Sequence, residues 1–157
     1  MKYYFALLFV ILVLGCVGSQ VPSTSGKVIV KGDNISVEYT GTFENDTIFD
    51  SSLSLQFTVG AGQMIKGFDA AVIGMHDSEE KNVTIKPDEA YGNYSLDNIM
   101  IFPISSVPNG TKAGDVLYGD GQPVRVLEVR NDTVFIDVNH PLAGKTLVFK
   151  IRIVKIN

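Results

Sequence analysis

The sequence of 157 residues has little of several residue types on which common protein chemistry depends. It contains no tryptophan, one cysteine and two histidines. Because Cys16 is the only cysteine, a disulfide within the chain is excluded. His76 and His140 have no cysteine or carboxylate cluster at ligand spacing around them, so the sequence predicts no metal site.

Nucleotide-binding loops are also missing. The segment Gly144-Lys145-Thr146 resembles the end of a phosphate-binding loop, but Asn139 stands where the first glycine is required. Gly60 and Gly62 lack the third glycine of a dinucleotide-binding loop, so no cofactor is expected. With 13 Lys and Arg against 17 Asp and Glu, the formal charge is −4. An acidic chain without a basic cluster argues against nucleic acid as a partner.

Only one long apolar run is present, the twelve residues 3–14. It is too short for a comfortable membrane span and typical of the core of a signal peptide. The run leads into Val13-Leu14-Gly15-Cys16, which resembles a lipobox. We therefore expect residues 1–16 to be a signal peptide and Cys16 to carry lipid that anchors the protein to the membrane, outside the cytoplasm. An uncleaved anchor, or a cysteine there by chance, is the alternative. Residues 17–27, rich in Gly, Ser, Thr and Pro, predict a tether.

Six of the nine asparagines begin an Asn-x-Ser/Thr triplet. Such triplets are acceptors for N-glycosylation on exported proteins. The alternative is turn chemistry, since Asn, Ser and Thr all favour turns. The excess favours glycosylation and an archaeal surface protein. The candidate acceptors are Asn34, Asn45, Asn82, Asn93, Asn109 and Asn131.

Four stretches alternate apolar and polar residues with the period of a half-buried strand, namely 35–40, 53–59, 82–86 and 147–153. In 53–59 the pattern places Leu53, Leu55, Phe57 and Val59 on one face. Residues 65–72 have the spacing of a short helix, and Gly74 is expected to end it. The sequence thus predicts an α+β fold, a mostly antiparallel sheet wrapped on one short helix.

Between residues 93 and 138 the character of the chain changes. Pro103, Pro108 and Pro123 interrupt it, and 124–129 and 133–138 predict two strands joined by a turn at Asn131-Asp132. This indicates a small, mostly β domain inserted into the first. Its apolar residues are expected to divide between the domain's own core and a binding surface; they include Ile99, Met100, Ile101, Phe102, Ile104 and Val107.

Short motifs occur in a particular order along the chain. They are Phe49-Asp50-Ser51-Ser52, Gly60, Ile65-Lys66-Gly67-Phe68-Asp69, Ala90-Tyr91-Gly92, Asn139-His140-Pro141-Leu142-Ala143-Gly144 and Leu147-Val148-Phe149. Together they resemble the FKBP-type peptidyl-prolyl cis/trans isomerases over roughly residues 28–157. The gap after Ala-Tyr-Gly resembles the SlyD-like subgroup, which carries an insert-in-flap domain there. The resemblance implies an isomerase domain of residues 28–92 and 139–157 and an insert domain of residues 93–138.

The resemblance also implies a site for proline. The residues that match the family's catalytic pocket are Tyr39, Phe49, Asp50, Tyr91 and Phe149. Those that would contact substrate around it are Leu55, Met64, Ile65, Phe68 and Leu142. Phe68 stands where many members have Trp, and Leu55 where many have an aromatic residue, which argues against tight macrolide binding. Singly, each phenylalanine is better explained as core, and Tyr39 and Tyr91 are also explained as ordinary half-buried tyrosines. The order of the motifs favours the site.

The implied function is a prolyl isomerase and folding chaperone for proteins outside the cytoplasm. Its partners would be proline-containing peptides and unfolded proteins, bound by a monomer. The competing hypothesis is a binding module that keeps the fold without turnover, since fold alone does not fix function.

Overall fold

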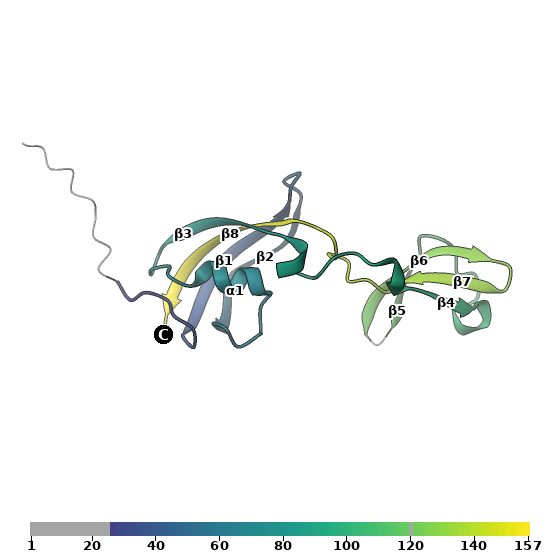
Figure 1. Cartoon of the computed structure of the whole chain (residues 1–157), viewed down its shortest axis with the longest axis horizontal. Coiled ribbons are helices and arrows are strands. Elements are labelled where there is room, and N and C mark those ends of the chain that lie inside the picture. The colour runs from purple at the N-terminus through teal and green to yellow at the C-terminus, as the bar shows by residue number, and fades with distance from the viewer. Residues whose placement is uncertain (1–25, 120) are drawn as a thin grey trace, which may run out of the picture.

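The computed structural model describes residues 26–119 and 121–157, so Cys16 and the leader lie outside the described residues. Two four-stranded antiparallel sheets lie at the two ends of an elongated molecule (Figure 1). The first has the strand order β2-β1-β8-β3 and the second the order β4-β7-β6-β5. One short α-helix, α1 (Lys66–Val72), lies against the first sheet. The predicted α+β fold with an antiparallel sheet and a short helix is confirmed.

The first sheet consists of β1 (Asn34–Phe43), β2 (Ile48–Thr58), β3 (Glu80–Ile85) and β8 (Leu147–Ile156). The second consists of β4 (Ile99–Pro103), β5 (Val116–Gly119), β6 (Gln122–Arg130) and β7 (Thr133–Asp137). Three single 3-10 turns accompany them, at Pro87–Glu89, Leu96–Asn98 and Ile104–Ser106.

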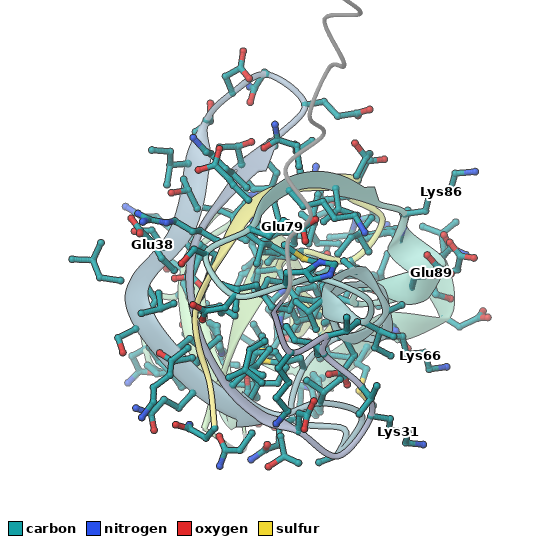
Figure 2. The ribbon with its side chains drawn as sticks, turned by 90° about the vertical axis from the view of Figure 1, so that its left-hand side faces the viewer. Lys31, Glu38, Lys66, Glu79, Lys86 and Glu89 are labelled. Carbon is teal, nitrogen blue, oxygen red and sulfur yellow. The ribbon has the colours of Figure 1, made fainter. Side chains whose placement is uncertain are left out.

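Strand β8 is one of the two central strands of the first sheet and shows why the alternating pattern is informative. Phe149, Ile151 and Ile153 are buried, whereas Lys150 and Arg152 between them face solvent. Lys150 pairs with Glu80 at 3.0 Å and Arg152 with Glu38 at 3.7 Å on that outer surface. Figure 2 shows Glu38 on one side of the sheet and Lys66 of α1 on the other. The apolar face of the sheet is therefore the one that α1 covers.

Helix α1 packs closely because a glycine faces the sheet. Phe68, Ala71 and Val72 are buried in the first core. A Cβ atom on Gly67 would collide with the Ile85 side chain of β3, so the absence of a side chain sets the distance between helix and strand. Gly74 follows the helix with φ +85, in the left-handed region, as predicted for the residue that ends it.

Strand β2 departs from the predicted alternation. Val37 of β1 pairs with Leu55, but Tyr39 pairs with Ser52, so β2 contains an extra residue at this point. Such a bulge resets which face each side chain takes. Leu53 is consequently 80% exposed, so its predicted place on the same face as Phe57 and Val59 is wrong.

The second sheet has its own small core of Val126, Val134 and Ile136. The turn at Asn131-Asp132 between β6 and β7 occurs as predicted, with Asn131 at φ +44. Strands β4 and β5 were not predicted. No helix within the described ranges is long and apolar enough to cross a membrane.

Candidate active site

A cavity of about 260 Å³ opens on the first sheet beside the start of α1. It lies where β1, β2 and β8 approach the loop before the helix and the turn that follows β3. Its lining residues are Tyr39, Phe49, Asp50, Gly62, Gln63, Met64, Ile65, Phe68, Tyr91 and Phe149.

Aromatic rings packed edge to face form the floor and walls of this pocket. Phe68 is fully buried, and its ring centroid lies 5.3 Å from that of Phe149 and 5.7 Å from that of Tyr39. Phe49 meets Phe149 at 5.7 Å with the planes at 90°. Such pairs hold each ring in one orientation, which gives the pocket a preformed apolar surface.

Two features of the first sheet bring Phe49 into the pocket. Gly41 pairs with Asp50 and Thr42 with Ile48, so Phe49 is the extra residue of a second bulge in β2. Bulges re-aim side chains. A Cβ atom on Gly41 would lie 2.7 Å from Cζ of Phe49 and 3.0 Å from Cε1 of Phe149. The bare backbone of Gly41 therefore provides the space that both rings occupy.

The polar side of the pocket is a hydrogen-bonded pair. The Tyr39 hydroxyl donates to Oδ2 of Asp50 at 2.6 Å, and the Ser51 N–H donates to its Oδ1 at 2.9 Å. Burial, together with the hydrogen bond to Asp50 and its charge, raises the pKa of Tyr39 well above its usual value. The phenol thus stays protonated and keeps the carboxylate fixed at the edge of the aromatic surface.

Tyr91 also lines the pocket and stacks on His140. The two rings are 4.0 Å apart between centroids, with their planes 3° apart. Nδ1 of His140 accepts a hydrogen bond from the Leu142 N–H at 3.1 Å, which places the ring proton of the neutral imidazole on Nε2. Burial, and then the charge of Asp50, raise the pKa of Tyr91. Its hydroxyl therefore remains a donor near neutral pH.

The loop before α1 supplies a backbone donor. The Ile65 N–H makes no hydrogen bond to the part of the chain that the structure describes, while the Ile65 carbonyl accepts from Phe68 N–H at 3.0 Å. Oε1 of Gln63 accepts from the Thr58 N–H at 2.8 Å and ties the loop to the end of β2. A free N–H at the pocket edge suits a carbonyl group of a bound peptide.

The structure gathers most of the residues that the sequence singled out. Eight of the ten pocket residues line the cavity, whereas Leu55 and Leu142 pack against the first core beside it. Four contributors were missed, namely Gly41, Gly62, Gln63 and the stacking partner His140. An isolated glycine within a strand pattern was the available signal for Gly41.

Nothing in the described residues resembles a metal centre, since no group of three or more His, Cys, Asp and Glu side chains comes together there. All six asparagines of the Asn-x-Ser/Thr triplets are exposed. Cys16 cannot be placed because it lies outside the described residues.

A sequence profile of the FKBP-type peptidyl-prolyl cis-trans isomerases matches residues 26–154. The chain belongs to this family. It is 34% identical to the short-type peptidyl-prolyl cis-trans isomerase of Methanocaldococcus jannaschii, over 80% of this chain and 92% of that protein. It is 35% identical to the FKBP-type isomerase SlyD of Treponema pallidum, over 76% of this chain and 73% of the relative. FK506-binding protein 1A of Neurospora crassa is 42% identical, but over only 45% of this chain.

The protein is therefore a peptidyl-prolyl cis-trans isomerase, and these relatives favour the enzyme over a binding module without turnover. Rotation about a peptide bond crosses a barrier of about 18–20 kcal/mol, because amide resonance is lost in the twisted state. The twisted amide has less charge separation than the planar one, so a water-poor aromatic pocket favours it. The candidate pocket fits this requirement, since aromatic rings line it and hydrogen-bond donors lie at its edge.

Proposed function

We propose that this isomerase is an exported, lipid-anchored folding catalyst of an archaeal cell surface. In this proposal the first sheet, within residues 28–92 and 139–157, turns prolyl bonds. The second sheet, within residues 93–138, is an insert-in-flap domain that binds unfolded protein chains and presents their prolines. The protein acts as a monomer, and no cofactor takes part.

A cleft in the second sheet is the observation that carries the chaperone role. It has a volume of about 660 Å³ and is larger than the pocket of the first sheet. Two of its side chains are strongly exposed, Met100 at 47% and Tyr118 at 77%. An exposed apolar cleft of this size supports binding of extended apolar segments. The lining residues are Met100, Phe102, Ser106, Val107, Pro108, Leu117, Tyr118, Gly119, Gln122, Val124, Ile136 and Val138.

The apolar run at the start of this domain divides between packing and exposure. Phe102, Ile104 and Val107 pack against the small core of the second sheet. Met100 and Ile101 on β4 are 47% and 61% exposed. Those two residues contribute little to the fold of the domain, which supports their use as contacts for a client chain.

Two sites on one chain give a physical advantage for protein clients. A segment held weakly in the second cleft raises the effective concentration of its neighbouring prolines at the catalytic pocket. A short peptide reaches only the catalytic pocket and gains nothing from the second sheet. The proposal therefore predicts that peptide turnover and catalysis of protein refolding can be changed independently, which a single-site isomerase would not allow.

The test compares a short Ala-Leu-Pro-Phe peptide with a protein whose refolding is limited by proline isomerisation. The double variant Met100→Ser, Tyr118→Ser should turn over the peptide at the rate of the unchanged protein. Its catalysis of refolding should fall by roughly tenfold or more as the second contact is lost. The control is Leu127→Ser, which changes a residue that is 39% exposed on β6 but does not line the cleft. Equal losses with both substrates would contradict the two-site proposal.

The leader and the Asn-x-Ser/Thr triplets support the surface location. The six exposed asparagines include Asn45 in the β1–β2 turn, Asn109 beside the second cleft and Asn131 in the β6–β7 turn. Mass spectrometry of the protein from its own cells should find lipid on Cys16 and glycan on these asparagines. An intact leader and unmodified asparagines in the mature protein would contradict export and glycosylation.

A further inference from the structure

In the part of the chain that the structure describes, two segments that run side by side join the two sheets (Figure 1). The outgoing segment follows Gly92, and the returning segment follows β7. Gly144 N–H donates to the Gly92 carbonyl at 2.8 Å, and Val138 N–H donates to the Asn98 carbonyl at 3.0 Å. We call this crossing, residues 92–98 and 137–144, the junction.

Among the described residues, no shared apolar core holds the two sheets together. The buried cluster of the first sheet and that of the second have no residue in common. Apolar packing therefore stabilises each sheet by itself and leaves their relative orientation to the junction. Hydrogen bonds are the interactions there that depend on direction and so can fix an angle.

Asn139 lies at the centre of the junction. It is one of two buried polar residues of the described chain, with 8% of its surface exposed. Its Oδ1 accepts from Ser95 N–H at 3.1 Å and from Asn98 Nδ2 at 3.0 Å. Its Nδ2 donates to the Ser95 carbonyl at 2.9 Å and to Oδ1 of Asp137 at 2.7 Å. The amide thus uses its two donors and both acceptor positions, and it links the outgoing segment to the returning one.

Asp137 and Tyr94 extend the same network. Asp137 Oδ1 also accepts from Asn139 N–H at 2.9 Å, and its Oδ2 accepts from the Tyr94 hydroxyl at 3.0 Å. Burial opposes ionisation of Asp137, but hydrogen bonds from Asn139 and Tyr94 and the charge of Arg125 lower its pKa overall. Tyr94 lies close to the returning chain, since a Cβ atom on Gly144 would be 3.0 Å from Cβ of Tyr94.

We propose that Asn139 is a positioning residue, which holds the second sheet at a set angle to the catalytic pocket so that a protein client bound in one reaches the other. The proposal rests on the two-site function proposed above. Asn139 does not line the catalytic pocket, so it acts on delivery of the client rather than on the prolyl bond. A gain in effective concentration depends on both sites being reached at once, and a freely rotating second sheet would lose part of it.

The experiment uses the full chain with Cys16→Ser and spin labels on cysteines introduced at Lys155 of β8 and Leu127 of β6. Distances between the labels report the angle between the sheets, and peptide turnover and protein refolding are measured on the same variants without labels. Asn139→Ala should broaden the distance distribution and raise KM for protein refolding by roughly tenfold, while peptide turnover stays unchanged. Tyr94→Phe, which removes one hydrogen bond at an exposed residue, should give a smaller change in the same direction.

The matched control is Asn82→Ala, which removes an exposed asparagine from β3, outside the junction. It should leave both the distances and the kinetics unchanged. A narrow distribution in both junction variants would overturn the positioning role, and so would equal losses with peptide and protein. If the wild-type protein catalyses the refolding of protein clients no faster than the Met100→Ser, Tyr118→Ser variant, the two-site function is contradicted. The delivery of clients from one site to the other is then contradicted as well. The distances would then still decide whether Asn139 sets the angle.

Discussion

The phenol ring of Tyr91 lies flat on the imidazole of His140, 4.0 Å away and tilted by 3°. The Leu142 N–H donates to Nδ1 of that imidazole, an interaction that only the neutral ring can accept. His140 therefore supports one wall of the candidate pocket in a way that depends on its protonation.

Lowering the pH should weaken the contact by which His140 supports Tyr91. Burial lowers the pKa of His140 from its usual value of 6.5, so the neutral ring is favoured in the folded protein. A lowered pKa contributes stability that is present above the unfolded value and is lost as the pH falls through the folded one. We expect peptide turnover to be constant above about pH 7 and to decline below about pH 6. His140→Phe, which keeps a flat ring without a titrating group, should retain activity and lose this decline. If the peptide turnover of His140→Phe declined at the same pH as that of the wild-type protein, another group would be responsible for the decline.

The bond between Tyr39 and Asp50 should matter for turnover and little for stability. Asp50 is exposed, so Asp50→Ala should change the free energy of unfolding by less than about 1 kcal/mol. We expect peptide turnover to fall by about tenfold or more, because the carboxylate orients the polar edge of the pocket. Tyr39→Phe should also lower peptide turnover. Since the two groups form one pair, the double variant should lose less than the product of the single losses. Fully multiplicative losses would show that they act independently.

Gly41 should tolerate no side chain. Gly41→Ala would bring a carbon atom to 2.7 Å from Phe49, so ring or backbone must move. We expect a destabilisation of about 1–3 kcal/mol in urea unfolding, together with reduced peptide turnover. The matched control is Gly119→Ala in β5, where the nearest atom to the new carbon would be 3.8 Å away. It should be close to neutral in both measurements, and equal effects at the two glycines would contradict the steric account.

At Gly67, helix propensity and packing predict opposite effects of a change to alanine on the free energy of unfolding. Alanine in a helix is ordinarily about 1 kcal/mol more favourable than glycine. Gly67→Ala should nevertheless destabilise the protein, because the new carbon would collide with Ile85 of β3. Combining it with Ile85→Ala should cost less free energy of unfolding than the sum of the two single variants, since the side-chain atoms that the new carbon would meet are removed. A stabilised single variant would show that α1 can move away from the sheet at little cost.

Hydrophobic periodicity in the sequence predicted the elements that bury one face and expose the other along their whole length. Strand β8 alternates without interruption, and the spacing of Ile65, Phe68 and Val72 identified α1. The bulges of β2 left no such trace, because they arise from pairing with β1 and not from the order of residues within β2. Leu53 was placed on the wrong face for this reason. Strands β4 and β5 were missed because each is short, and their pairing partners decide their conformation.

The candidate site was accessible to sequence reasoning only through the order of its motifs. Tyr39 and Phe149 come from strands far apart in the sequence, and nothing local brings them together. His140 was noticed as part of a motif, but its contact with Tyr91 depends on how the chain returns from the second sheet. Leu55 and Leu142 matched the motifs as well as the others did, yet both pack beside the pocket.

The position of β8 between β1 and β3 has a consequence for how the protein is made. Ile35 pairs with Ile156, so the catalytic sheet cannot close before the ribosome has passed that residue. The strands of the second sheet are consecutive in the sequence, and the last of them ends at Asp137. Domains that are complete early in synthesis generally fold first. We expect the second sheet to be able to form before the first, because β1 and β2 must wait for β8, which ends at Ile156.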